Sequence, residues 1–190
     1  QHKSGGLTID ATGAENFTTI TVISPSFHNQ DVIWAGTDDG NEQVTRDGGE
    51  NWNNVAPNMD GVPEGSWVVQ IKPSRFNEGE AVVVVNNYRR ADWTPYLMRT
   101  TNYGQSWQNI AEGKGLEGYM LSYVQDPVEP SLQFAGTEFG LYVSIDDGKT
   151  WTEWTNGYPT ASTYDMVIHP REHDLVIGTF GRSAWVLDDI

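Results

Sequence analysis

The sequence contains three stretches that align with one another: TRDGGENW at residues 45–52, TTNYGQSW at 100–107 and SIDDGKTW at 144–151. All fit the pattern Ser/Thr-x-Asp-x-Gly-x-x-Trp, with asparagine replacing aspartate in the second copy. An aspartate or asparagine side chain can accept a backbone N–H two residues on, and glycine adopts the positive φ that other residues resist. We therefore expect each stretch to form a tight structural turn between two strands, here called a box turn, with its tryptophan packed between sheets. The residues of these turns are Thr45, Asp47, Gly49, Trp52, Thr100, Asn102, Gly104, Trp107, Ser144, Asp146, Gly148 and Trp151.

The sequence around the box turns repeats as well. An apolar segment ending in proline comes first, as in TITVISP at 19–25, and a second segment ending in Gly-Thr follows, as in VIWAGT at 32–37. A third segment leads into the box turn, and a fourth starts at its tryptophan, as in WNNVAP at 52–57. Four short strands over about 45 residues are the content of one blade of a β-propeller. The sequence therefore predicts an all-β propeller of four-stranded antiparallel blades.

The repeats divide the chain, residues 1–190, into about four blades of one propeller segment. The predicted blades cover residues 17–57, 66–112, 119–157 and 162–187, and the last lacks a fourth strand. Within residues 1–13, the strand-like stretch Leu7 to Ile9 could pair with the last blade and close a small ring. Alternatively, the chain is part of a larger ring, and an open array would then leave a blade face and a sheet edge exposed to association.

Composition excludes several function classes. The net charge is −15, whereas a nucleic-acid binder needs a basic footprint, so we expect no nucleic-acid partner. No stretch approaches the roughly 18 apolar residues of a membrane helix, so we expect no membrane insertion. The chain has no cysteine, its four histidines lack metal-ligand spacing, and no glycine-rich phosphate loop is present. We therefore expect neither a metal nor a cofactor.

The box turns resemble the BNR or Asp-box repeats of the sialidase and sortilin-like superfamily. Longer strings are more specific: GGLTIDATGAENFTTI (5–20), VIWAGTDDGNEQVTRDGGENW (32–52), FAGTEFGLYVSIDDGKTW (134–151) and HDLVIGTFGRSAWVLDDI (173–190). These look like the C-terminal part of the propeller in large secreted bacterial proteins labelled sortilin-like or glycosyl-hydrolase-like. The resemblance implies a bacterial protein that is secreted, extracellular or periplasmic, and a ring with further blades. It does not imply one activity, because Asp-box propellers include both enzymes and binding proteins.

Candidate ligand-binding residues come from the loops opposite the box turns. In a propeller these are the loops between the second and third strands of a blade (B–C) and between consecutive blades (D–A). The longest is the insert NNYRRADWTPY at 86–96, and long loops on rigid scaffolds tend to carry function. The alternative is that Arg89 and Arg90 brace adjacent blades by pairing with acids such as Asp38 or Glu138. The candidates are Asp38, Asp39, Tyr88, Arg89, Arg90, Asp92, Trp93, Glu138, Phe139, Tyr158, Phe180 and Arg182, flanked by Asp60, Glu64, Lys114 and Glu117 in the D–A loops.

Catalysis is the competing hypothesis. A sialidase needs three arginines from the inner strands, and the four candidate inner strands (17–23, 66–72, 119–125 and 162–168) contain none. A two-carboxylate glycosidase needs an acid and a base or nucleophile about 5–9 Å apart. Asp165 is the best single candidate, with Glu138 or Asp38 as its partner.

We therefore expect a non-catalytic, secreted binding module that recognises a protein, peptide or glycan on its B–C and D–A loop face. Its partners would also include further propeller blades or another chain. The alternatives are a glycoside hydrolase whose site is completed by blades outside this chain, and a structural segment of a larger assembly.

Overall fold

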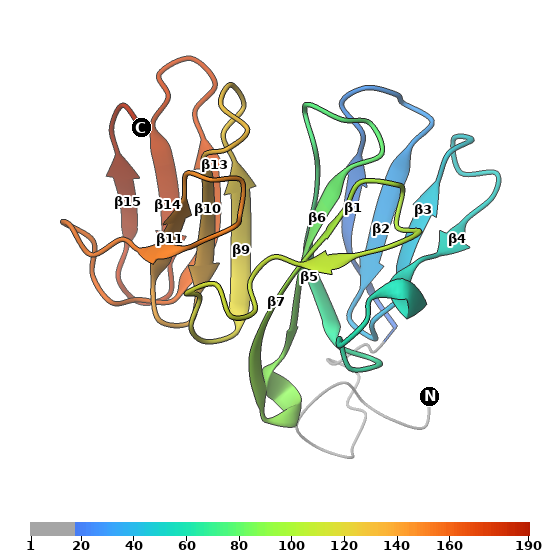
Figure 1. The fold of residues 1–190 in the computed structure, drawn as a ribbon, viewed down its shortest axis with the longest axis horizontal. Helices are drawn as coiled ribbons and strands as arrows, with labels where there is room; N and C mark the ends of the chain where they lie inside the picture. The colour runs from blue at the N-terminus through green and yellow to red at the C-terminus, as the bar shows by residue number, and fades with distance from the viewer. Residues whose placement is uncertain (1–17) are drawn as a thin grey trace. The chain divides into compact units, whose positions relative to one another are not determined.

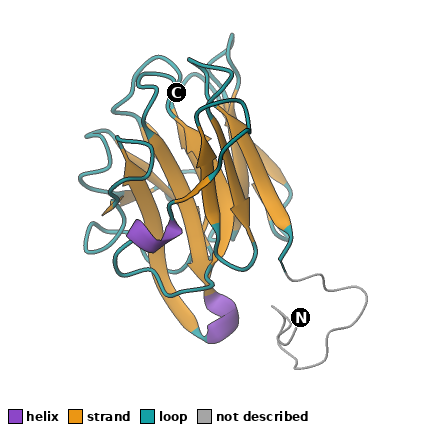
Figure 2. Ribbon diagram, turned by 90° about the vertical axis from the view of Figure 1, so that its right-hand side faces the viewer, coloured by secondary structure: helices purple, strands orange, loops and turns teal. Residues whose placement is uncertain are grey.

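The computed structural model describes residues 18–190, which form an all-β structure (Figure 1). Four antiparallel sheets follow one another along the chain, three with four strands and the last with three. In this part of the chain the helical elements are two 3₁₀ turns, Ala56–Asn58 and Tyr88–Arg90 (Figure 2). The predicted fold class, an all-β chain of propeller-like blades, is confirmed. The predicted strand at Leu7 to Ile9 lies outside the described residues.

Within each sheet, strands that are consecutive in sequence are neighbours. Sheet 1 contains β1 (Ile20–Pro25), β2 (Ile33–Thr37), β3 (Glu42–Thr45) and β4 (Asn53–Asn54). Sheet 2 contains β5 (Trp67–Pro73), β6 (Ala81–Asn87), β7 (Asp92–Thr100) and β8 (Gln108–Asn109). Sheet 3 contains β9 (Met120–Gln125), β10 (Gln133–Thr137), β11 (Leu141–Ser144) and β12 (Thr152–Glu153). Sheet 4 contains β13 (Thr163–Ile168), β14 (Leu175–Thr179) and β15 (Ala184–Leu187).

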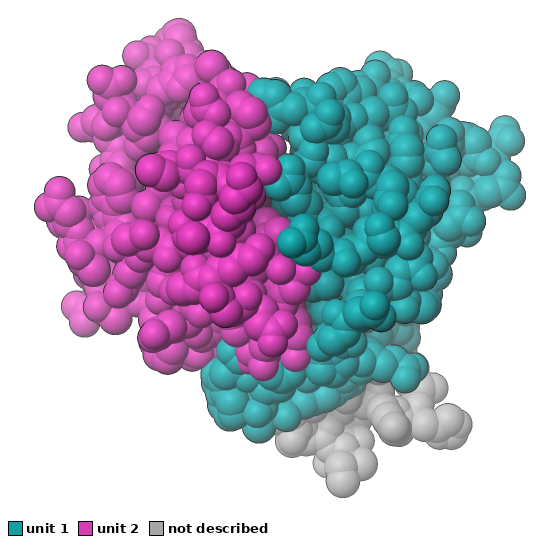
Figure 3. All heavy atoms as spheres, in the orientation of Figure 1, with its two compact units in different colours: residues 1–93, 98–108 teal, residues 94–97, 109–190 magenta. Residues whose placement is uncertain are grey.

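The chain forms two compact units, described separately below (Figure 3). Unit 1 comprises residues 1–93 and 98–108 and includes sheet 1 with β5 and β6 of sheet 2. Unit 2 comprises residues 94–97 and 109–190 and includes sheets 3 and 4.

In unit 1, sheet 1 packs closely on the first strand of sheet 2. A Cβ atom at Gly36 would lie 2.4 Å from Val68 Cγ1, so only glycine allows this approach. The Thr21 hydroxyl donates to the Val68 carbonyl at 2.8 Å, and the Ser24 hydroxyl donates to the Ile71 carbonyl at 2.8 Å. We call the face of a sheet that packs on the following sheet its forward face, and the opposite face, which packs on the preceding sheet, its rear face.

In unit 2, sheets 3 and 4 repeat this junction. A Cβ atom at Gly136 would lie 2.5 Å from the Thr163 carbonyl oxygen, to which the Ser122 hydroxyl donates at 2.8 Å. The apolar core between them joins the forward face of sheet 3 to the rear face of sheet 4. Its buried members are Phe134, Leu141, Tyr158, Met166, Ile168, Leu175 and Ile177.

The box turns share one hydrogen-bond pattern. The hydroxyl of the first residue accepts a hydrogen bond from the backbone N–H two residues on, as when the Asp47 N–H donates to Thr45 Oγ1 at 3.3 Å. The aspartate instead accepts from four residues on, since the Asn51 N–H donates to Asp47 Oδ1 at 2.9 Å. The expected bond to the aspartate from the N–H two residues on is therefore wrong, because that N–H, of Gly49, donates to Thr45 Oγ1 at 3.0 Å instead. In the second copy Asn102 Oδ1 likewise accepts from the Ser106 N–H at 3.0 Å.

The tryptophans of the box turns differ in burial. Trp151 is buried, and its indole N–H donates to the Ile110 carbonyl, in the segment that leaves sheet 2, at 2.8 Å. Trp107 packs edge-on against Trp34 of sheet 1 with ring centroids 6.2 Å apart. Trp52 is 42% exposed, so within residues 18–190 it lacks the packing between sheets that we expect of these rings. The reason is that these rings pack on the preceding sheet, and residues 18–190 contain no sheet before sheet 1.

A buried acid departs from the repeat pattern. Glu42 lies three residues before its box turn, where the other two blades with a box turn have Leu97 and Leu141, and it is fully buried. Within residues 18–190 neither of its carboxyl oxygens has a hydrogen-bond partner. Desolvation by burial raises the pKa of Glu42 well above its usual value.

Replacing Glu42 with leucine should stabilise the protein. A buried polar group without a partner costs about 1–3 kcal/mol, so we expect Glu42→Leu to raise the free energy of unfolding by about this amount at neutral pH. Because the folded-state pKa is the higher one, the part of this cost that comes from ionisation is absent below the unfolded pKa of about 4.3. It then grows as the pH rises towards the folded pKa. Denaturant titrations at acidic and neutral pH should therefore show the larger stabilisation at neutral pH.

The matched control is Glu42→Gln, which keeps the size and polarity of the side chain but cannot ionise. The stability difference between the leucine and glutamine variants should be independent of pH. A leucine variant that is less stable than the original protein at neutral pH would contradict our description of this site.

The box aspartates should contribute stability that is lost in acid. The Thr150 hydroxyl and N–H, followed by the Ser144 hydroxyl, lower the pKa of Asp146 to about 2. A depressed folded-state pKa gives stability that is present above the unfolded pKa of about 3.9 and is lost as the pH falls towards the folded pKa. Thermal melts of Asp146→Asn should therefore lose less stability than the original protein between these two pH values. The reverse change, Asn102→Asp, should increase the loss, and equal acid sensitivity in all three proteins would refute this assignment.

Candidate functional site

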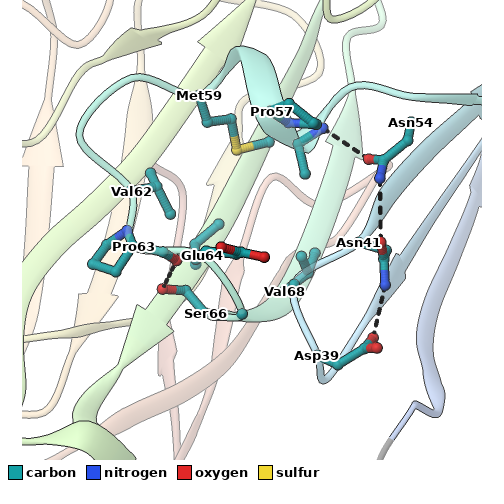
Figure 4. Close-up of a pocket in the computed structure, with 14 residues that line it drawn as sticks. Asp39, Asn41, Asn54, Pro57, Met59, Val62, Pro63, Glu64, Ser66 and Val68 are labelled. Carbon is teal, nitrogen blue, oxygen red and sulfur yellow. Dashed lines mark hydrogen bonds between the residues drawn. The ribbon is translucent and has the colours of Figure 1, made fainter.

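Unit 1 contains a cavity of about 620 Å³ (Figure 4). One side is formed by the loop between β2 and β3, with Asp39 and Asn41, and the other by the segment between β4 and β5. Val68 of β5 and Val85 of β6 also line it. The two loops are the B–C and D–A loops of the first blade, so the cavity opens among the loops that the sequence pattern selected.

A chain of side-chain hydrogen bonds holds the polar side of the cavity (Figure 4). The Thr37 hydroxyl and the Asn41 amide both donate to Asp39 Oδ1, the second at 3.0 Å. The Asn54 amide donates to Asn41 Oδ1 at 3.2 Å, and the Ala56 N–H donates to Asn54 Oδ1 at 3.1 Å. These bonds fix the side chains in place, so this side of the cavity is organised before any ligand arrives.

The opposite side is largely apolar and is tied to sheet 2. Met59, Val62 and Pro63 line it, with Glu64 labelled among them in Figure 4. The Arg90 guanidinium donates to the Glu64 carbonyl at 2.7 Å, which fixes the loop. The cavity thus combines two carboxylates with an apolar wall, an arrangement that can accept hydrogen bonds from a cationic group while burying apolar atoms beside it. Within residues 18–190 no group of three or more His, Cys, Asp or Glu side chains could hold a metal ion.

The insert at 86–96 is not the long loop that we expected. Asn86 and Asn87 belong to β6 and residues 92–96 to β7, so only residues 88–91 form the turn. The strands β6 and β7, with 7 and 9 residues, are longer than the corresponding strands β2 and β3 of sheet 1, with 5 and 4 residues. The Arg89 guanidinium lies 3.9 Å from the ring centroid of Trp67, and the Asn87 amide donates to Asp92 Oδ2 at 3.1 Å. Trp93 is exposed on β7.

In unit 2 the structure brings several predicted residues together. The Ser162 hydroxyl donates to the Glu138 carbonyl at 2.9 Å, and the Phe180 N–H donates to the Ser162 carbonyl at 3.0 Å. Phe180 and Tyr164, both exposed, have ring centroids 5.8 Å apart. Asp165 follows Tyr164 on β13, and its Oδ1 accepts from the Met166 N–H at 2.9 Å.

Three further predicted residues, Tyr158, Phe139 and Arg182, differ in burial and in the contacts that they make. Tyr158 is buried in the core of unit 2, and its hydroxyl lies 2.7 Å from Thr163 Oγ1, so it is a core residue and not the surface ligand contact that we expected. Phe139 is exposed and packs against Gly118. The Arg182 carbonyl accepts from the Trp185 indole at 2.8 Å.

The candidate catalytic carboxylates belong to different units. Asp38 is in unit 1, where its Oδ1 accepts from the Thr19 N–H at 2.8 Å. Glu138 and Asp165 are in unit 2. Of the predicted residues, it is Asp39, Glu64 and Arg90 that the structure gathers at the cavity or its wall.

Most residues of the cavity wall could not be predicted from the sequence. Asn41 and Asn54 belong to predicted strand segments, and Met59 and Val62 belong to no repeated motif. A signal was present in the first D–A segment, PNMDGVPEGS at 57–66, which has two prolines and two glycines between two predicted blades. Such a segment indicates an ordered loop with several turns rather than one tight turn.

Comparisons with known proteins establish the fold of the chain but assign it to no family. No family model and no curated protein matches the chain. The chain resembles a GH74 xyloglucanase from Xanthomonas campestris, at 19% identity and a TM-score of 0.65, over 88% of this chain and 27% of that one. It resembles YCF48 bound to D1 peptide, at 18% identity and a TM-score of 0.57, over 90% of this chain and 54% of that one. It also resembles the extracellular domain of a hybrid two-component system of B. thetaiotaomicron, at 14% identity and a TM-score of 0.63, over 89% of this chain and 20% of that one.

These neighbours are β-propeller proteins, and the present chain has their fold. The chain spans only about a fifth to a half of their lengths. They include both a glycoside hydrolase and a peptide-bound protein, so the fold is compatible with either kind of function. Within residues 18–190 no helix is long and apolar enough to cross a membrane.

Proposed function

We propose that this chain is a non-catalytic binding module that recognises a polypeptide segment at the cavity of unit 1. The observation that carries the proposal is the cavity itself, about 620 Å³ in volume and bounded by Asp39 and Glu64 together with an apolar wall. A cavity that combines apolar lining with a few fixed polar groups is the usual form of a binding site.

The chemistry of the cavity favours a basic side chain beside an apolar one. Asp39 and Glu64 attract a cation, and the net charge of −15 steers basic partners towards the chain. Met59, Val62 and Pro63 supply the surface on which an apolar side chain can be buried. The amide groups of Asn41 and Asn54 bond within the wall, so they support the Asp39 carboxylate rather than compete for the ligand.

Two further considerations support a polypeptide ligand and a location outside the cytoplasm. YCF48, a protein of the same fold, has been solved bound to a peptide. The sequence resembles parts of secreted bacterial proteins, and one structural neighbour is described as an extracellular domain. A protein surface or a glycan remains a ligand class that a binding screen should include.

Peptide binding should depend on the two cavity carboxylates. In fluorescence anisotropy against a library of labelled peptides, we expect the best binders to pair lysine or arginine with an apolar residue. Glu64→Gln or Asp39→Asn should weaken such a binder roughly tenfold, since a hydrogen bond to a charged group contributes about 1.5 kcal/mol. Val62→Arg should weaken binding further, because the arginine fills the cavity and its positive charge repels the basic side chain of the peptide. Binding to the original protein should fall as salt is added.

The matched control for this experiment is Glu117→Gln, which removes the same charge from a D–A loop in unit 2. It should leave the affinity within about twofold. Equal affinity in Glu64→Gln, Val62→Arg and the original protein would show that the cavity is not the binding site.

A second candidate function is glycoside hydrolysis. The observation in its favour is the exposed pair of rings, Tyr164 and Phe180, directly beside Asp165 in unit 2. Aromatic faces can stack on sugar rings, and a carboxylate beside them could act as an acid or base. The likeness to a GH74 xyloglucanase is one of fold and does not by itself extend to this activity.

We expect no release of reducing sugar from a panel of polysaccharides that includes xyloglucan. If the chain does hydrolyse one of them, Asp165→Asn should reduce the rate by at least about a hundredfold, since a general acid or base contributes this much. Asp188→Asn, which changes another exposed acid of unit 2, is the control. Hydrolysis that is lost in Asp165→Asn but kept in Asp188→Asn would overturn the non-catalytic assignment.

A further inference from the structure

The two terminal sheets each expose a face that is buried elsewhere in the same fold. At the junctions within the units, the forward face of one sheet covers the rear face of the next. Within residues 18–190 no sheet precedes sheet 1 in the chain to cover its rear face, and no sheet follows sheet 4 to cover its forward face. The equivalent positions of the other sheets show what such faces contact when a neighbouring sheet is present.

The rear face of sheet 1 is exposed at positions that are buried in sheets 2 and 4. The strand register aligns Ile23 with Ile71 of sheet 2 and Met166 of sheet 4, each opposite the corresponding residue of the second strand. Ile71 and Met166 are 2% and 3% exposed, whereas Ile23 is 63% exposed. Ile20, on the same face, is 59% exposed. A rear face that is buried in its two counterparts is therefore open here.

The forward face of sheet 4 shows the same contrast. Val167, Val176 and Val186 form one cross-strand row, equivalent to the row Ser24–Trp34–Val44 of sheet 1. Trp34 and Val44 are 0% and 2% exposed. In sheet 4, Val167 and Val186 are 58% and 52% exposed.

Space for an approaching strand is also present on sheet 4. Gly178 corresponds to Gly36 and Gly136, which contact the first strand of the following sheet so closely that a Cβ atom would lie 2.4 Å from Val68 Cγ1 and 2.5 Å from the Thr163 carbonyl oxygen, respectively. At Gly178 the nearest atom to such a Cβ is the Asp165 carbonyl oxygen of the same sheet, at 3.8 Å. The glycine is therefore in place, but the strand that it would admit is absent from the described residues.

We propose that the forward face of sheet 4 binds the rear face of sheet 1 of a second copy of this chain. The occupant is identified by continuity with the internal junctions, where a forward valine or aromatic row meets a rear isoleucine or methionine. A second copy presents the required rear face, with Ile20 and Ile23 at the matching positions. The contact joins two different surfaces, so it is head-to-tail and either closes into a ring or continues as a chain of copies.

The electrostatics of this contact give it a distinctive salt dependence. Each copy carries a net charge of −15, so two copies repel one another at low ionic strength. The paired rows are apolar, with Asp165 as the acid on the forward face. Moderate salt should therefore strengthen the association by screening this repulsion. This is the opposite of the trend expected for peptide binding at the cavity, so the two proposals can fail independently.

The experiment is to measure the solution mass of the 190-residue chain by sedimentation velocity over a wide range of concentration. We expect a mass of at least two chains that decreases on dilution. Val176→Arg on sheet 4 and Ile23→Arg on sheet 1 should each weaken the association roughly 30-fold or more, as expected for a charge placed at the centre of an interface. Circular dichroism would verify that both variants remain folded.

Mixing the two variants provides the decisive measurement. Each variant keeps one intact face, so the mixture should form a one-to-one dimer although neither variant associates alone. The matched control is Ile145→Arg, which changes an exposed residue of a box turn where another copy of the motif already has Arg46. It should leave the association unchanged. A monomeric original protein at every concentration, as a self-closed ring would give, overturns the proposal, and so does association that persists in both arginine variants.

Discussion

The close approach of one sheet to the next, through a glycine in the second strand, is the contact on which the rest of this structure depends. Gly36 admits Val68 of sheet 2, and Gly136 admits the Thr163 backbone of sheet 4. A side chain at either position would push the sheets apart and open the core, where tightly packed residues such as Trp34 and Phe134 now lie. Hydroxyl groups of Thr21, Ser24 and Ser122 reinforce the same contact by donating to carbonyls of the following sheet.

The spacing that this junction sets also positions the candidate site. Val68 packs on Gly36 at the junction and lines the cavity of unit 1, so the cavity is an extension of the packed interface towards the loops. The same two sheets carry the loops that bear Asp39 and Glu64, which are therefore held by rigid elements rather than by a mobile segment. Glu42, on the strand next to Gly36, shows that this blade tolerates an unsatisfied acid where its neighbours have leucine. Nothing in the structure explains why the acid is there.

The sequence was sufficient to predict the fold class, because the repeat is carried by glycine, proline and tryptophan at fixed spacing, and these residues act locally. What could not be predicted depends on partners that lie far away in sequence. Trp52 is exposed although its motif matches that of Trp151, because burial depends on the preceding sheet and not on the motif. We expected Tyr158 at the surface because it lies in a predicted D–A loop, yet its ring completes the core of unit 2. The cavity could not be predicted, because its wall combines two loops and no local sequence pattern indicates that these loops lie close together.

The distribution of acids is the reason that we propose binding rather than hydrolysis. Glycosidic cleavage at neutral pH needs one carboxyl that keeps its proton and a second placed across the sugar. Burial gives Glu42 a raised pKa, but it is fully buried, where no sugar can reach it. The carboxylates that solvent reaches at the cavity, Asp39 and Glu64, are arranged around an apolar wall rather than beside exposed rings. The exposed rings lie in unit 2 next to Asp165, whose Oδ1 already accepts a backbone hydrogen bond. Charge and apolar surface thus meet at the cavity in the combination that a basic, partly apolar peptide requires.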